Sequence, residues 1–251
     1  MFVRALGDGA ESVLVLHGQL FDGRVMLPIA EALAARGKRA LVPDLPGYGQ
    51  TPLGEGNPLE QAREALLELV AREELSSLSV VGLSLGTFHA TRLALELGPR
   101  VKRLALIGAL AGLPEEARAG LAGFGDAIDQ RAMSPAEMDA LVIQRMFSPA
   151  FAAASPEICK SLLALFAELD LSALAGELHA LGHLPDLRPQ ISGLSAALSL
   201  FCGALDVATP IELSRELAQL APRAKLRELP GVGHLCFVEK PALVAEIADA
   251  I

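Results

Sequence analysis

The sequence predicts an α/β protein, built on a doubly wound, mostly parallel sheet with an inserted group of helices. Short apolar runs alternate with stretches of helical periodicity up to residue 110 and again after residue 189, as βαβ units require. Residues between these two stretches carry helix signals only. We therefore expect a core made of residues 1–110 and 189–251, and a helical cap insertion at residues 111–188.

Length and charge narrow the class of protein. The chain has 251 residues, enough for one full hydrophobic core, and 30 acidic against 21 basic residues give a net charge of −9. This balance argues against nucleic acid and anionic membrane surfaces as partners, because both bind clustered Lys and Arg. The sequence has no secretory signal and no run of about 20 apolar residues. We expect a cytoplasmic protein, monomeric or homodimeric.

The strand predictions come from short apolar runs that end at glycine, proline or charged residues. The helix predictions come from apolar residues at helical spacing and from terminal signals such as Gly37 and Gly98. The predicted strands are residues 13–16, 39–42, 78–81, 101–107, 198–202 and 226–229, and the predicted core helices are 24–36, 59–72, 85–97, 210–220 and 241–251.

Two helix starts are marked clearly inside the insertion. Ser134 is followed by Pro135 and, three positions on, by Glu137, which is a capping box with proline at the first helical position. Ser155 and Pro156 open a second helix, expected to run to residue 169. A third is expected over residues 172–181.

Gly82, Ser84 and Gly86 form a G-x-S-x-G motif at the junction of the strand 78–81 and the helix 85–97. This context is typical of a nucleophile elbow, in which a sharp turn exposes the serine and the flanking glycines allow close packing. The start of the helix also offers unpaired backbone N–H groups. The motif makes Ser84 the candidate nucleophile.

A serine nucleophile needs a base, and the base needs an acid to orient it. His234 lies in a glycine-rich loop between the last strand and the last helix, at the sheet edge where ligands bind in such folds. Asp206 follows the strand 198–202, whereas the loop after Ile107 holds no carboxylate. Along the chain the nucleophile Ser84 comes first, the acid Asp206 second and the base His234 third, which is the order in hydrolases that have a nucleophile elbow.

The oxyanion donors are expected to be the backbone N–H groups of Gln19 and Leu85, with Gly18 supporting the first of them. His17 and Asp44 are interpreted as structural hydrogen-bonding residues in neighbouring loops.

His179 and His183 are spaced for zinc on one helix, but no third ligand accompanies them. We expect no metal and no organic cofactor.

Five blocks resemble, in the same order, those of the α/β-hydrolase superfamily, and in particular its small serine hydrolases with a helical cap, such as carboxylesterases and enol-lactonases. They are His17-Gly18, residues 44–51, residues 82–86, Asp206 with Thr209-Pro210, and Gly233-His234. The resemblance implies the hydrolase fold with a Ser-His-Asp triad. Because the N-terminal segment is short, we expect one or two leading strands to be missing.

The expected activity is hydrolysis of a carboxylic ester, lactone or thioester of a small to medium apolar substrate through an acyl-serine intermediate. Ser84 argues against epoxide opening and halide removal, for which relatives use an aspartate nucleophile. Two alternatives use the same triad, a carbon–carbon bond hydrolase and a perhydrolase. A third alternative is a ligand receptor of the same fold with slow turnover.

Overall fold

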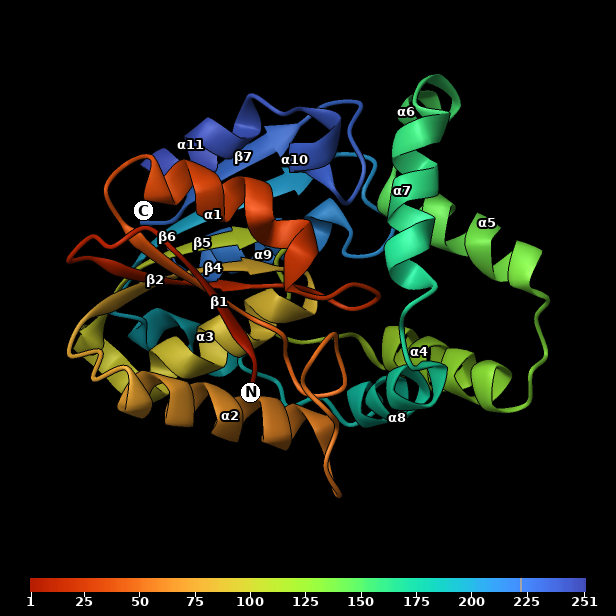
Figure 1. Ribbon diagram of the computed structural model, residues 1–251, viewed down its shortest axis with the longest axis horizontal. Coiled ribbons are helices and arrows are strands. Elements are labelled where there is room, and N and C mark those ends of the chain that lie inside the picture. The colour runs from red at the N-terminus through yellow and green to blue at the C-terminus, as the bar shows by residue number, and fades with distance from the viewer. Residues whose placement is uncertain (222) are drawn as a thin grey trace.

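The computed structural model describes residues 1–221 and 223–251. Within these residues seven strands form one sheet in the order β1-β3-β2-β4-β5-β6-β7 (Figure 1). β1 runs antiparallel to β3, and all the other neighbouring pairs are parallel, which confirms the predicted fold class. The strands are β1 (Val3–Leu6), β2 (Ser12–Leu16), β3 (Arg39–Pro43), β4 (Leu78–Leu83), β5 (Val101–Ile107), β6 (Ala197–Gly203) and β7 (Lys225–Leu229).

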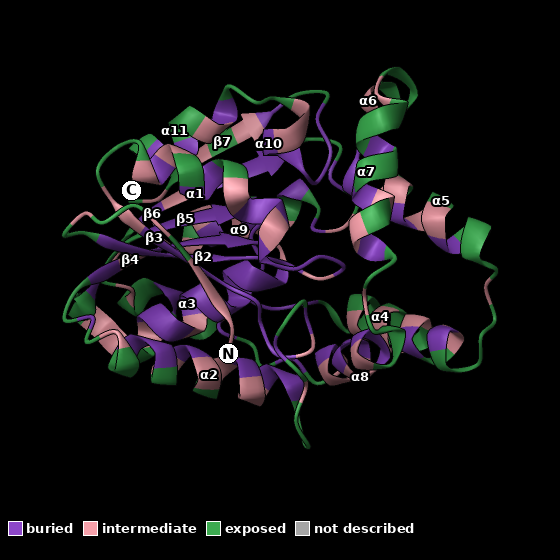
Figure 2. Ribbon diagram, viewed as in Figure 1, coloured by how far each residue is buried: buried purple, intermediate pink, exposed green. Residues whose placement is uncertain are grey.

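Helices cover both faces of the sheet, with α1 and α11 on one face and α2 and α3 on the other (Figure 1). The central strands are buried on both faces, as expected for parallel strands between two helical layers (Figure 2). In the part of the chain that the structure describes, no helix is long and apolar enough to cross a membrane. The helices outside the segment between β5 and β6 are η1 (Gly23–Met26), α1 (Leu27–Ala34), α2 (Pro58–Arg72), α3 (Leu85–Leu97), η2 (Gly98–Arg100), α9 (Ile211–Leu220), α10 (Cys236–Glu239) and α11 (Leu243–Asp249).

The segment between β5 and β6 is helical and stands beside one end of the sheet (Figure 1). We call its helices α4–α8 the helical insertion. α5 begins at the expected capping box, in which the Ser134 hydroxyl accepts the Glu137 N–H and the Glu137 carboxylate accepts the Ser134 N–H. The division of the chain at residues 110 and 189 stays a prediction. The elements are α4 (Glu115–Asp129), α5 (Pro135–Met146), α6 (Pro149–Ala154), α7 (Pro156–Phe166), α8 (Leu171–Leu181) and η3 (Arg188–Gly193).

One leading strand, β1, was not among the strands predicted from the sequence. It has only four residues, none of them fully buried, and it lies at the sheet edge against β3. An edge strand this short carries little apolar periodicity, and its partner lies far along the chain. The hydrophobic periodicity of the local sequence therefore could not predict this strand.

Three other differences have local causes. The expected helix 24–36 begins as a 3₁₀ turn, and α1 starts only at Leu27, because Pro28 suits the first turn of an α-helix but not its interior. Pro241 likewise separates α11 from α10, which was not predicted. α4 was missed because its three glycines weaken the helix signal.

The start of α3 packs directly on the end of β2. A Cβ atom at Gly86 would lie 2.4 Å from the His17 carbonyl oxygen and 2.6 Å from that of Leu16. A Cβ atom at Gly82 would lie 2.6 Å from the Gly86 carbonyl oxygen. These neighbours are backbone atoms, so they cannot move aside cheaply, and both glycines are required by close approach.

Gly86→Ala is expected to lower the free energy of unfolding by about 1–3 kcal/mol, the usual range for overpacking. In a chain of this size that corresponds to roughly 2–4 °C in Tm per kcal/mol, measurable by calorimetry. Gly120→Ala is the control. It lies inside α4 with no atom within 4 Å of an added Cβ, and it should gain about 0.5–1 kcal/mol. A Gly86→Ala protein as stable as the wild type would contradict the packing argument.

Candidate active site

Ser84 occupies the turn between β4 and α3 with a left-handed backbone, φ 53° and ψ −122°. Such a conformation is costly for a residue other than glycine and persists only where the surroundings fix it. Here the Ser84 N–H donates to the Ile107 carbonyl at 2.8 Å, and the Thr87 hydroxyl donates to the Ser84 carbonyl at 2.6 Å. The turn therefore holds the serine at the carboxyl end of the central strand.

His234 and Asp206 meet beside this turn, although 28 residues separate them in the sequence. His234 Nδ1 lies 2.7 Å from Asp206 Oδ2, and both side chains are buried. The second oxygen, Asp206 Oδ1, accepts the backbone N–H groups of Ala208 and Thr209 at 2.9 and 2.8 Å. Burial raises the pKa of Asp206, but the charge and hydrogen bond of His234 and the Thr209 donors outweigh it, so the pKa lies below its ordinary value.

Gly108, directly after β5, makes room for this pair. It has a φ of +61°, and a Cβ atom there would lie 2.6 Å from Thr209 Oγ1 and 3.0 Å from His234 Cε1. From sequence this loop was notable only for having no carboxylate. The structure adds that position 108 of this loop has no room for a side chain.

Ser84 and His234 line one narrow cavity of about 50 Å³. Within the described residues no hydrogen bond joins the Ser84 hydroxyl to the His234 imidazole, and such bonds are often long in unliganded sites. The rest of the lining is mainly apolar and comes from the strand ends and the helical insertion: Leu20, Leu85, Leu110, Leu113, Leu121, Phe124, Met146, Leu178, Leu181 and Ala208.

Gln19 and Leu85 both line this cavity. Among residues 1–221 and 223–251, neither backbone N–H has an acceptor. A Cβ atom at Gly18 would lie only 2.7 Å from Ser84 Cβ, so the loop that carries Gln19 runs directly beside the serine. Two free donors thus lie close to the hydroxyl, one of them at the positive end of α3.

His17 and Asp44 hold the surrounding loops. His17 Nε2 accepts the Leu45 N–H at 2.9 Å, which leaves Nδ1 to donate to the Gly18 carbonyl at 2.8 Å. Burial lowers the pKa of His17, so the ring is neutral. Asp44 accepts the N–H groups of Gly23 and Gln50 and pairs with Arg4. Both residues act on backbone rather than on the cavity.

The two histidines spaced for zinc do not form a metal site. His179 Nε2 lies 3.1 Å from Asp126 Oδ1, which joins α8 to α4, and His183 is exposed. The described residues contain no group of three side chains that could hold a metal ion.

Sequence reasoning missed Glu177, a buried carboxylate on α8. The Gln19 amide donates to Glu177 Oε2 at 2.9 Å, and the Tyr48 hydroxyl donates to the same oxygen at 2.5 Å. Burial raises the pKa of Glu177 to about 7, against the opposing effect of these two hydrogen bonds. The available signal was a lone carboxylate in an otherwise apolar helix, but its partners lie 129 and 158 residues away.

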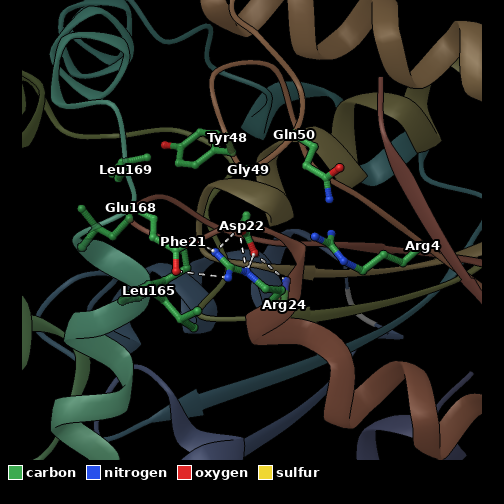
Figure 3. A pocket seen from close by; sticks show the side chains of 11 residues that line it. Arg4, Phe21, Asp22, Arg24, Tyr48, Gly49, Gln50, Leu165, Glu168 and Leu169 are labelled. Atoms are coloured by element: carbon green, nitrogen blue, oxygen red, sulfur yellow. Dashed lines mark hydrogen bonds and ion pairs between the residues drawn. The ribbon is translucent and has the colours of Figure 1, made fainter.

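A larger cavity of about 240 Å³ is drawn in Figure 3, and Leu20 lines both this cavity and that of Ser84. Its lining is polar and includes neither Ser84 nor His234. Arg24 lies between Asp22, at 2.8 Å, and Glu168, at 2.7 Å, and so joins the core to the helical insertion. The arginines and the acidic residues that line it are paired with one another or with Asp44, and the lining holds no serine, cysteine or histidine, so the smaller cavity is the candidate active site.

The model of the alpha/beta hydrolase family matches residues 13–247. The chain belongs to the alpha/beta hydrolase family. This membership confirms the predicted resemblance, since the family match covers nearly all of the chain.

Two similar proteins are named pimeloyl-acyl-carrier protein methyl ester esterase. The one from Chromobacterium violaceum is 31% identical over 257 residues, covering 95% of this chain and 92% of that protein. The one from Vibrio cholerae is 30% identical over 247 residues, with the same coverage of 95% and 92%. Among solved structures, the enol-lactonase from Burkholderia xenovorans has a TM-score of 0.87 at 23% identity, covering 99% of this chain and 95% of that chain, which supports the fold alone.

Glu177 makes the stability of this hydrolase depend on pH. The unfolded chain loses the Glu177 proton near its ordinary pKa of 4.5, whereas the folded protein keeps it up to about pH 7. Between these values the folded state binds more protons, so the free energy of unfolding falls as the pH rises, by about 3 kcal/mol in total. Glu177→Gln removes this contribution, which urea unfolding between pH 4.5 and 8 will measure.

Glu116→Gln, on the exposed side of α4, is the matched control and should keep the wild-type slope. The same slope in Glu177→Gln as in the wild type would refute the assignment of the proton to Glu177.

Proposed function

We propose that this hydrolase cleaves a carboxylic ester through an acyl-serine intermediate, with Ser84 as nucleophile, His234 as base and acid, and Asp206 as the residue that orients His234. One observation carries the proposal. The left-handed Ser84 shares a cavity with a buried histidine that bonds to a buried carboxylate at 2.7 Å. The two half-reactions described next use these three side chains and the backbone N–H groups of Gln19 and Leu85.

In the first half-reaction, Ser84 Oγ attacks the carbonyl carbon while His234 Nε2 takes the hydroxyl proton. The carbonyl oxygen becomes negative and accepts hydrogen bonds from the Gln19 and Leu85 N–H groups. When the tetrahedral intermediate collapses, the bond to the alcohol oxygen breaks and His234 returns the proton to that oxygen. The alcohol leaves, and the acyl group stays on Ser84.

In the second half-reaction, a water molecule attacks the acyl carbon and gives its proton to His234. The bond to Ser84 Oγ breaks, the proton passes back to the serine, and the carboxylic acid leaves. Asp206 stays ionised throughout, since its pKa lies below the ordinary value, and its bond fixes the proton of His234 on Nδ1.

The substrate is proposed to be a methyl ester whose acyl chain is apolar next to the ester group. The leucine-rich lining favours an apolar acyl chain, and the small volume beside Ser84 suits a small leaving alcohol. The names of the two relatives, both methyl ester esterases, support the same choice.

Ser84→Ala is expected to lower kcat/KM on methyl and p-nitrophenyl esters by at least about a thousandfold, because the nucleophile is lost. Tm should not fall, since alanine leaves the turn and its hydrogen bonds in place. Ser76→Ala, at the opposite end of β4, is the control and should match the wild type. Retention of more than a few per cent of the wild-type rate would overturn the nucleophile assignment.

Asp206→Asn is expected to lower kcat by up to about ten thousandfold, because the amide favours the wrong imidazole tautomer. The test is steady-state kinetics on the ester that Ser84 hydrolyses best. A loss smaller than tenfold would show that Asp206 does not orient the base.

A further inference from the structure

Arg145 is the single residue with a permanent charge among the described residues that line the Ser84 cavity. It lies in the last turn of α5 and is half-buried. The triad chemistry proposed above gives it no role. Its surroundings in the cavity are mainly leucine, methionine and alanine side chains, so a cation there requires an explanation.

The guanidinium of Arg145 has no hydrogen bond and no ion pair within residues 1–221 and 223–251. Two other arginines near the insertion are paired, Arg24 with Asp22 and Glu168, and Arg188 with Asp186. Burial lowers the pKa of Arg145, and the charge of Asp206 raises it. Both oxygens of Asp206 already accept hydrogen bonds from other groups. Arg145 is therefore a partly desolvated cation with unused donors.

The position of Arg145 is fixed relative to His234. The carbonyl of the next residue, Met146, accepts the Leu235 N–H at 2.9 Å. Glu239 accepts the N–H groups of both Ser148 and Gly233, at 2.7 and 3.0 Å. The end of α5 is thus tied to the backbone on both sides of His234, which holds the backbone at Arg145 near this loop.

We propose that Arg145 is an anion subsite of this cavity that binds a free carboxylate on the substrate, so that the preferred substrate is a monoester of a dicarboxylic acid. The inference rests on the proposed ester hydrolysis and specifies its substrate. A carboxylate matches the planar donors of a guanidinium and can bind it through two hydrogen bonds. An entirely apolar ester would leave the cation unpaired, whereas an acidic ester supplies its partner.

The net charge of the protein bears on how an acidic substrate could be selected. With a net charge of −9 the protein as a whole repels anions, so acidic substrates gain nothing from long-range attraction. Selectivity for an acid must then come from a local cation inside the cavity. In the lining, Arg145 is the residue that supplies it.

The test compares two methyl esters of equal size, monomethyl adipate and the methyl ester of adipic acid monoamide. The first carries a carboxylate where the second carries a neutral amide. The wild type is expected to show a kcat/KM at least about tenfold higher on the acid, the usual worth of a hydrogen bond to a charged group. Arg145→Met should reduce this ratio to about one, and Arg145→Lys should keep part of it.

Arg131→Met, on the exposed link between α4 and α5, is the matched control and should keep the wild-type ratio. A wild-type ratio of one or less for every diacid from four to eight carbons would overturn the proposal. An Arg145→Met variant that loses activity equally on both esters would overturn it too.

If neither ester is cleaved in a Ser84-dependent manner, the proposed hydrolysis has failed rather than the subsite. Calorimetric titration with adipate then decides the subsite by itself. Binding to the wild type that weakens at least about tenfold in Arg145→Met supports it, and equal binding or no binding by both proteins refutes it. Thermal melting of Arg145→Met and Arg145→Lys shows that the compared proteins are folded.

Discussion

The backbone turn at Ser84 is the constraint on which the rest of the site depends. A left-handed residue between β4 and α3 is tolerated because glycines on both sides let α3 approach β2 and β4 at distances that no side chain would allow. The same close approach brings Gly18, and with it the Gln19 loop, against the serine. Strain at one residue therefore sets the distance between the nucleophile and its proposed oxyanion donors.

The sheet converts this local turn into a complete site. β2, β4, β6 and β7 run parallel, so their carboxyl ends lie at one edge, and each is followed by one of the proposed site residues. These residues are Gln19, Ser84, Asp206 and His234 in chain order. The helical insertion lies over the same edge and supplies apolar walls and Arg145.

Much of this arrangement was predictable because its signals are local. The parallel strands are apolar runs, α3 begins at a motif of five residues, and the glycine-rich loop at His234 is visible without a structure. β1 was not predictable, since its four residues include no buried one and are defined by their pairing with β3. Glu177 and Arg145 were hidden for a related reason: the partners of Glu177 are distant in sequence, and the fold is needed to show that Arg145 lines the cavity of Ser84.

Glu177 has a mechanical consequence that follows from which of its atoms is used. Both of its donors, the Gln19 amide and the Tyr48 hydroxyl, end on the single oxygen Oε2. A displacement of this oxygen therefore changes both hydrogen bonds. The position of α8 is thereby coupled through one atom to the loop of Gln19, whose backbone N–H is a proposed oxyanion donor.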